Sequence, residues 1–282
     1  MKINKAKSAG FCVGVKRAIN LALKTAESKE KVYMLGDIVH NEEVVLRIKK
    51  AGIKKIDRLG YGNDKILLIR AHGVGLKTIA EAAKRGYKIV DATCPMVKEI
   101  HRIAQRLESQ GFKTIVIGEK KHDEVQGIVG RLKGKPIVIS HINEVSSKRF
   151  KNISKAAVVV QSTQNTQRVL EIVEKLRTLI TELEFFDTIC KPTKIKQKEA
   201  KELPLHNDVV IVVGSKNSAN TKRLFEISKK SNPRTYWIGR KEELKRQWFK
   251  DAKTIGVTAG ASTPDSTIDD IIRHLSALGH ML

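Results

Sequence analysis

The sequence predicts an α/β fold made of three similar α/β domains, each with a mainly parallel sheet, arranged around a pseudo-threefold axis and a central site. Short apolar runs alternate with amphipathic segments along the 282 residues, which is the pattern of parallel sheets covered by helices. One spacing between a cysteine, a glycine and a polar residue also recurs three times. A chain of this length can bury the cores of three small units.

The elements follow from the periodicity of the apolar residues. Helices are predicted over residues 13–26 and 166–180, where apolar residues recur at helical spacing. Strands are predicted where short apolar runs end in turn residues. These runs are residues 32–35, 65–69, 88–90, 114–117, 136–139, 156–160, 209–213 and 254–257.

Each cysteine begins the same series of residues. A glycine lies 24 positions after each of Cys12, Cys94 and Cys190, and it directly follows an apolar strand. A polar side chain stands four positions after each glycine, and another follows the next strand. The first set of polar residues is His40, His122 and Ser218, and the second is His72, Thr163 and Ser262.

The repeat also predicts the domain boundaries. Residues 1–12 form an N-terminal segment that carries the first cysteine, and residues 13–94 form the first α/β domain. Residues 95–190 form the second domain, and residues 191–282 form the third, with a C-terminal helix.

We expect the cysteines and the six polar residues to converge on one central pocket. Cys94 precedes Pro95, a favoured first helical residue, and Cys12 and Cys190 also precede helical segments. Helix N-termini favour the anionic thiolate that binds metals. In open α/β sheets, groups that follow the carboxyl ends of strands face the ligand crevice.

Three distant cysteines allow three interpretations. They could be inert core residues, although the shared offset argues against this. They could bind zinc, but structural zinc sites usually use close cysteine pairs, and these cysteines are 82 and 96 positions apart. We favour a cubane iron–sulfur cluster, because three thiolates leave one iron open to substrate.

The polar residues predict a phosphate site. Residues 214–220, with Ser218 and Asn220, and residues 259–264, with Ser262, combine small residues, exposed N–H groups and hydroxyls at helix starts. Each turn could equally be a plain N-cap. Glu124, two residues after His122, is placed to relay a proton as a general acid, and its alternative role is to favour the helix dipole.

The formal net charge of +24 raises the question of a nucleic-acid partner. We expect none, because the basic residues are spread along the chain as solvated helix faces, as in 194–201 and 241–250, with no aromatic-rich RNA-binding stretch. A basic surface also suits an anionic substrate or an acidic electron-transfer protein. No apolar run approaches the roughly 20 residues that cross a bilayer, and an odd number of thiols suits a reducing compartment. We therefore expect a cytoplasmic protein with no membrane partner.

Six segments carry a resemblance to a known family. They are GFCVGVKRA at 10–18, RAHG at 70–73, DATCP at 91–95, HDEV at 122–125, GSKNSAN at 214–220 and TAGASTPD at 258–265. Together they resemble the 4-hydroxy-3-methylbut-2-enyl diphosphate reductase (LytB) family, from residue 8 to about residue 275.

The resemblance implies reductive dehydroxylation of (E)-4-hydroxy-3-methylbut-2-enyl diphosphate to isopentenyl and dimethylallyl diphosphate, the last step of the methylerythritol phosphate route to isoprenoids. It implies that the three cysteines hold a 4Fe-4S cluster with one open iron, and that Glu124, Thr163 and His122 deliver the proton. It also implies ferredoxin or flavodoxin as electron donor, and three internal units suit a monomer. The implied substrate contacts are His40, His72, His122, Thr163, Ser218, Asn220 and Ser262.

Four residues depart from the usual pattern of that family. Asp123 stands where proline is usual, Ala219 where serine is usual, and Pro192 and Lys196 where alanine and arginine are usual. Two other interpretations stay open. One is a different three-cysteine cluster enzyme, such as a quinolinate synthase-like dehydratase, and the other is a basic RNA-binding protein with a structural metal.

Overall fold

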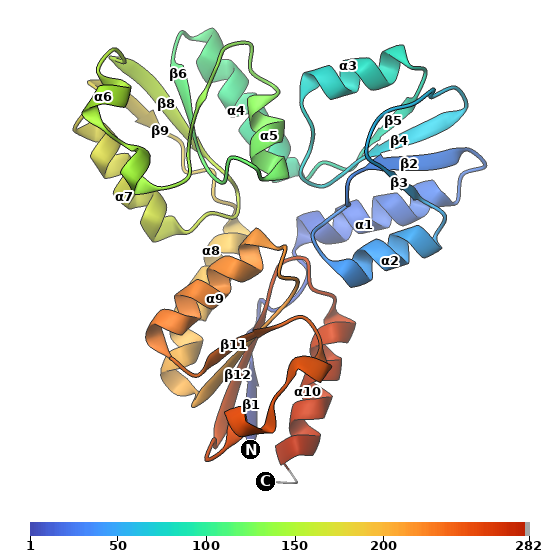
Figure 1. Cartoon of the computed structure of the whole chain (residues 1–282), viewed down its shortest axis with the longest axis vertical. Helices are drawn as coiled ribbons and strands as arrows, with labels where there is room; N and C mark the ends of the chain where they lie inside the picture. Colours follow the sequence, from blue (N-terminus) through green and yellow to red (C-terminus); the bar gives the residue numbers. More distant parts are fainter. Residues whose placement is uncertain (280–282) are drawn as a thin grey trace. The chain divides into compact units, whose positions relative to one another are not determined.

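The computed structural model describes residues 1–279 and contains three four-stranded sheets (Figure 1). Their strand orders are β1–β12–β10–β11, β3–β2–β4–β5 and β7–β6–β8–β9. All neighbouring strands in these sheets are parallel. The predicted class, three α/β units with parallel sheets, is confirmed.

The chain divides into two compact units, which are described separately. The first unit comprises Met1–Lys16, His40–Leu46 and Lys191–Leu282, and it holds the β1–β12–β10–β11 sheet. The second unit comprises Arg17–Val39 and Arg47–Cys190, and it holds the other two sheets.

The sheet of the first unit consists of β1 (Lys2–Lys5), β10 (Val209–Val213), β11 (Thr235–Ile238) and β12 (Thr254–Ala259). Alternate residues of β10 pack on opposite faces. Val209, Ile211 and Val213 lie in one core with α10 (Asp265–Gly279), while Val210 and Val212 lie in another with α8 (Lys191–Glu202) and α9 (Ala219–Ser231). Because both faces are covered, the strand is apolar at every position.

The second unit contains two sheets of the same design. One has β2 (Lys31–Leu35), β3 (Lys54–Ile56), β4 (Lys65–Ile69) and β5 (Lys88–Asp91), and the other has β6 (Lys113–Ile117), β7 (Ile137–Ile139), β8 (Lys155–Val160) and β9 (Glu182–Phe185). The α-helices that the structure places from residue 13 to residue 177 are α1 (Val13–Ala26), α2 (Glu42–Lys50), α3 (Leu76–Lys84), α4 (Pro95–Ser109), α5 (Asp123–Val129), α6 (Ser147–Phe150) and α7 (Thr166–Arg177).

Both faces of the β7–β6–β8–β9 sheet are covered in the same way. Ile115, Val158 and Val160 pack with α7, whereas Val116 and Val159 pack with α4 and α5. Figure 1 shows α4 and α5 on the opposite side of this sheet from α7. Buried parallel strands of this kind produce the continuous apolar runs that predicted them.

All eight predicted strands are present, and the predicted helix at 13–26 has those bounds. The helix predicted over 166–180 ends at Arg177. The prediction of a solvated helix face at 241–250 was wrong, because this stretch contains two short 3-10 helices, Lys241–Glu243 and Arg246–Phe249. The prediction for 194–201 was wrong at Lys196, which is 2% exposed.

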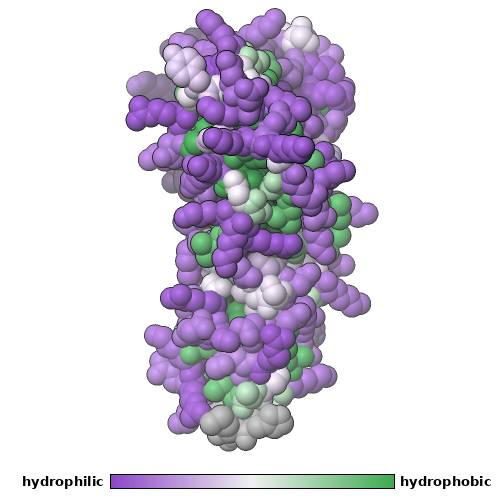
Figure 2. All heavy atoms as spheres, turned by 90° about the vertical axis from the view of Figure 1, so that its right-hand side faces the viewer, coloured by the Kyte–Doolittle hydropathy of each residue, from purple (hydrophilic) through white to green (hydrophobic). Residues whose placement is uncertain are grey.

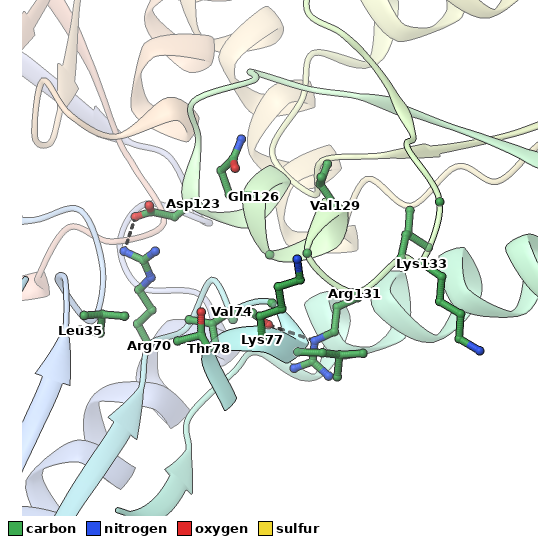
Figure 3. A pocket seen from close by; sticks show the side chains of 17 residues that line it. Leu35, Arg70, Val74, Lys77, Thr78, Asp123, Gln126, Val129, Arg131 and Lys133 are labelled. Carbon is green, nitrogen blue, oxygen red and sulfur yellow. Dashed lines mark hydrogen bonds and ion pairs between the residues drawn. The ribbon is translucent and has the colours of Figure 1, made fainter. Parts of the chain in front are cut away.

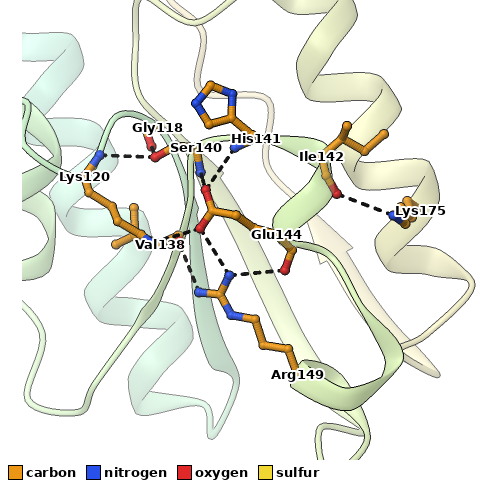
Figure 4. A network of polar contacts seen from close by, with 9 residues as sticks. All are labelled: Gly118, Lys120, Val138, Ser140, His141, Ile142, Glu144, Arg149 and Lys175. Carbon is orange, nitrogen blue, oxygen red and sulfur yellow. Dashed lines mark hydrogen bonds and ion pairs between the residues drawn. The ribbon is translucent and has the colours of Figure 1, made fainter.

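Glu144 organises the loop after β7 (Figure 4). Its carboxylate accepts hydrogen bonds from the backbone of Ser140 and His141 at 2.8 and 3.1 Å, and from Lys120 Nζ at 2.9 Å and Arg149 Nη1 at 3.3 Å. Partial burial works against the charged form, but the hydrogen bonds from Lys120 and the backbone outweigh it and lower the pKa of Glu144 to about 2. This network is structural and includes none of the predicted site residues.

The surface is largely hydrophilic on the face drawn in Figure 2, where hydrophobic side chains form small patches between hydrophilic ones. Within residues 1–279, no helix is both long and apolar enough to cross a membrane.

Candidate active site

The three cysteines occupy equivalent places in the three sheets. Each follows an edge strand, and all three are half-buried thiols that form no disulfide among the residues described. Each cysteine N–H donates to the carbonyl oxygen of the residue directly before a predicted site residue. These bonds join Cys12 to Ala261 at 3.2 Å, Cys94 to Ala71 at 2.9 Å and Cys190 to Ser162 at 3.1 Å, next to Ser262, His72 and Thr163.

The six polar residues of the repeat follow the two central strands of each sheet. These strands are β10 and β12, β2 and β4, and β6 and β8. In the β3–β2–β4–β5 and β7–β6–β8–β9 sheets the chain leaves the two central strands toward opposite edges, and such switch points form the ligand crevice of open α/β sheets. The prediction that the repeat places polar groups at the carboxyl ends of strands is therefore confirmed.

The first unit brings together His40, Ser218, Asn220 and Ser262. Ser262 Oγ donates to the carbonyl oxygen of His40 at 3.1 Å. Ser218 is the N-cap of α9, and its Oγ accepts from the N–H of Thr221 at 3.2 Å. Ser218 therefore does act as an N-cap, the role given above as the alternative to phosphate binding.

Asn220 is the unusual member of this group. Its side chain is 4% exposed, and neither its amide nitrogen nor its carbonyl oxygen has a hydrogen-bond partner among the residues described. Buried amides without partners are rare, because each such group carries a desolvation cost of about 1–3 kcal/mol. Asn220 is therefore a group that a polar ligand would satisfy.

Glu42 is a site residue that the sequence analysis did not identify. Its Oε1 accepts from Ser215 Oγ at 2.8 Å and from Asn217 Nδ2 at 3.4 Å, so it holds the turn that leads to Ser218. The signal was present, since Glu42 follows His40 by two residues, as Glu124 follows His122. Glu42 is exposed whereas Glu124 is buried, so equal positions in the repeat provide different chemistry.

The second unit brings His72 and His122 together. Their rings meet edge to face, with centroids 5.4 Å apart and an interplanar angle of 88°. His122 is the N-cap of α5, where its Nδ1 accepts from the N–H of Glu124 at 3.2 Å. A neutral imidazole that accepts at Nδ1 carries its proton on Nε2, which makes Nε2 a donor for an anionic ligand.

Glu124 is a buried carboxyl group, only 2% exposed. It accepts hydrogen bonds from the N–H and Oγ of Ser162 at 2.6 and 2.8 Å. Burial raises the pKa of Glu124 to about 6, and the hydrogen bonds from Ser162 only partly oppose this. A carboxyl group with this pKa can donate a proton near neutral pH.

Ser162 is a second residue that the sequence analysis missed. It holds the carboxylate of Glu124 with its side chain and accepts the N–H of Cys190 with its carbonyl oxygen. The next residue, Thr163, accepts a hydrogen bond at Oγ1 from Gln161 Nε2 at 3.2 Å. Residues 161–163 therefore connect the carboxyl group of Glu124, the hydroxyl of Thr163 and the backbone of Cys190.

An ion pair ties the β4 end to the start of α5. Arg70 Nη1 lies 2.6 Å from Asp123 Oδ2, and the side chains are only 16% and 27% exposed. Gly36, at φ +77°, leaves room for the guanidinium, because an added Cβ would lie 2.5 Å from Arg70 Nη1. The pair connects the segments that carry His72 and His122.

Lys196 is a buried lysine of the first unit. From α8 it donates to the carbonyl oxygens of Ser8, of Gly10 at 2.9 Å and of Ala259 at 3.3 Å. One ammonium group therefore holds both the segment that leads to Cys12 and the end of β12, which leads to Ser262.

The fold and these side chains define a class of protein: an α/β enzyme with one cysteine thiol per sheet and a set of imidazole, hydroxyl and amide groups suited to an anionic substrate. A model of the LytB protein family matches residues 3–276. The chain belongs to the LytB family.

Relatives of the same length support this assignment. The 4-hydroxy-3-methylbut-2-enyl diphosphate reductase of Geotalea uraniireducens (strain Rf4) is 39% identical over 278 residues, which cover 99% of this chain and 98% of the relative. A solved structure of (E)-4-hydroxy-3-methyl-but-2-enyl diphosphate reductase, described as the terminal enzyme of the non-mevalonate pathway, is 38% identical, with a TM-score of 0.73 and coverage of 98% of this chain and 100% of that chain.

A third match is the structure of the E-1-hydroxy-2-methyl-but-2-enyl-4-diphosphate reductase from Plasmodium falciparum. It is 28% identical, with a TM-score of 0.90, and the alignment covers 98% of this chain and 88% of that chain. The predicted family and enzyme class are confirmed by these matches.

Proposed function

We propose that this chain catalyses the two-electron reductive dehydroxylation of (E)-4-hydroxy-3-methylbut-2-enyl diphosphate to isopentenyl and dimethylallyl diphosphate. The observation that carries the proposal is Glu124, a buried carboxyl group with a pKa of about 6 beside the residues that the repeat aligns with the cysteines. The reaction needs such an acid, because the departing hydroxyl must be protonated to leave as water.

The three thiols fit a 4Fe-4S cluster. They are half-buried, form no disulfide among the residues described and are held by the same N–H bond in three parallel sheets, and no close cysteine pair of the zinc type is present in the sequence. Cys12, Cys94 and Cys190 would hold the cluster, which when bound supplies single electrons and an open iron for the substrate oxygen. Cysteines outside disulfides suit a reducing compartment, and we place the enzyme in the cytoplasm.

The diphosphate is assigned to amide, hydroxyl and imidazole donors. The N–H of the Asn220 amide, the hydroxyls of Ser218 and Ser262 and the imidazoles of His40, His72 and His122 can all donate to phosphate oxygens. The unpartnered amide of Asn220 supports this assignment, since a phosphate oxygen would satisfy its N–H. The substrate then brings the negative charge and the protein brings the hydrogen-bond donors.

Proton delivery is assigned to Glu124 with Thr163 and His122. Ser162 orients the carboxyl group with two hydrogen bonds, and the hydroxyl of Thr163 lies on the adjacent residue. His122 accepts the N–H of Glu124 at Nδ1, which places its ring beside the segment of the acid. Electrons come from a ferredoxin or flavodoxin, and the enzyme acts as a monomer.

An anaerobic assay with the hydroxylated allylic diphosphate and a small chemical reductant tests the proposal. We expect wild-type turnover, and iron and sulfide on the purified protein. Glu124→Gln should retain iron and bind substrate but lose about 10²–10⁴-fold in turnover, the usual contribution of a general acid. Glu174→Gln, at a side chain that is 74% exposed, is the matched control and should behave as wild type.

Other outcomes would exclude the proposal. Zinc without iron or sulfide would exclude the cluster, and near-normal turnover of Glu124→Gln would exclude the acid role. Salt-dependent RNA binding that is unchanged by metal removal, with no reductase activity, would favour the RNA-binding alternative.

A further inference from the structure

A basic cleft lies within the second unit, outside the residues assigned above to substrate and cluster. Its volume is about 690 Å³. One wall is the connection from β4 to α3 with the first turn of α3, including Gly73 and Lys77, and the other is the second half of α5 with the turn after it, including Arg131 and Lys133. Figure 3 shows the two walls and the side chains between them.

The lining of the cleft is strongly positive. It contains four cationic side chains and one acid, Asp123, whose charge is matched by Arg70 at 2.6 Å. Arg131 keeps its place through a bond from Nε to the carbonyl oxygen of Val74 at 3.0 Å. Lys77 and Lys133 have no ion-pair partner within residues 1–279, and in Figure 3 Lys77 reaches toward α5 while Lys133 stands at the end opposite Arg70.

The floor of the cleft lies against the segment that carries Cys94. Gly73 lines the cleft, and a Cβ added there would lie 3.1 Å from Thr93 Cγ2 and 2.8 Å from His101 Cε1. Thr93 directly precedes Cys94, whose N–H donates to the carbonyl oxygen of Ala71 at 2.9 Å. Since Gly73 has no side chain, one layer of backbone separates the cleft from the segment of this cysteine.

We propose that this cleft is where an acidic, one-electron carrier protein docks to deliver electrons toward Cys94. The inference rests on the proposed function, in which the C–O bond of the allylic alcohol breaks and a C–H bond forms. That reaction consumes two electrons and two protons and releases water, so two molecules of reduced carrier each lose one electron.

Charge and position together favour this occupant. An acidic surface would meet the three positive charges that Asp123 does not balance, which speeds encounter and sets orientation. A carrier bound in the cleft would be separated by one layer of backbone from the segment that carries a proposed cluster ligand. A basic patch elsewhere on the surface would offer positive charge but not this proximity. Lys77 and Lys133, which lie on opposite walls, would contact the carrier directly.

The test compares two reductants. The cleft variant is Lys77→Glu/Lys133→Glu. The control is Lys84→Glu/Lys135→Glu, which changes the net charge equally at exposed lysines on the same helix and the same turn, outside the cleft. Each holoenzyme is assayed anaerobically with a reduced plant-type ferredoxin and with reduced methyl viologen.

We expect the cleft variant to lose about tenfold or more in kcat/KM for ferredoxin, mainly through KM, and to match wild type with methyl viologen. The control variant should keep most of its ferredoxin activity. Added salt should lower the ferredoxin kcat/KM of wild type but change that of the cleft variant little, because screening acts on the charges that were removed.

Equal ferredoxin kinetics in the cleft and control variants would overturn the docking proposal. So would a loss of activity with both reductants, because docking residues are not needed by a small reductant. Failure of the wild-type enzyme with methyl viologen would instead overturn the proposed function, so the two failures are distinguishable.

Discussion

At the scale of the residue, Glu124 makes stability depend on pH. Its pKa lies at about 6 in the folded protein against 4.5 ordinarily, because burial disfavours the carboxylate. A raised pKa gives a contribution to stability that is complete below pH 4.5 and is lost as the pH rises through about 6. Relative to Glu124→Gln, wild type should therefore lose about 2 kcal/mol between pH 4.5 and 7.5.

Thermal unfolding of both proteins at several pH values measures this difference. The gap between their unfolding temperatures should change by a few degrees across the interval, since about 1 kcal/mol corresponds to roughly 2–4 °C in proteins of this size. Glu174→Gln should show no comparable change. Parallel curves for wild type and Glu124→Gln would contradict the raised pKa.

The residue scale also shows what the sequence could reveal about the site. The repeat identified Glu124 by its place after His122, but the burial that raises its pKa comes from tertiary packing. Ser162 was missed because a serine before a threonine carries no signal of its own. Its role depends on Glu124, which is 38 positions away in the chain.

At the scale of the element, α8 joins two parts of the site through Lys196. Lys196→Met would leave three carbonyl oxygens without their donor, and we expect a loss of about 2–4 kcal/mol in the free energy of unfolding. Hydrogen exchange should accelerate in residues 8–12 and 259–263, which the ammonium group holds. Urea unfolding and exchange measured by mass spectrometry test these two effects.

The controls for α8 lie on the same helix. Lys201→Met removes an exposed charge and should change stability by no more than about 0.5 kcal/mol. Lys196→Arg keeps a donor and should recover part of the protection. If the backbone amides of residues 8–12 and 259–263 exchanged at wild-type rates in Lys196→Met, the proposed positioning role of Lys196 would be wrong.

All six central strands of the described sheets were predicted, whereas four of their six edge strands, β1, β3, β9 and β11, were not, for a physical reason. β6, β8 and β10 are covered on both faces, so they are long apolar runs. The edge strands β3 and β9 have only three and four residues: β3 has two lysines before a single isoleucine, and β9 alternates glutamate with apolar side chains. Lys196 was misjudged because its acceptors lie 188, 186 and 63 positions away.

At the scale of the whole molecule, one of the three repeated units is completed by strand pairing between the two ends of the described chain. β1 pairs with β12 in the register Lys2 with Thr254, so the sheet of the first unit receives its cysteine-bearing edge strand from the N-terminus. The 24-residue spacing predicted three copies, but it could not show which sheet Cys12 joins. That depends on a pairing between residues about 250 positions apart. The domain boundaries stay a prediction.

This equivalence leads to a prediction for cluster loading. Each sheet presents one thiol after an edge strand, and the backbone N–H of each cysteine makes the same hydrogen bond. The three cysteines are therefore structurally equivalent. We expect Cys12→Ser, Cys94→Ser and Cys190→Ser to lose iron and sulfide to a similar degree, because each substitution removes one of three required thiolates. Elemental analysis after anaerobic purification measures the loss, and circular dichroism verifies that the fold persists. A folded variant that kept wild-type iron and sulfide would show that its cysteine is not a ligand, and the threefold interpretation of the site would fail with it.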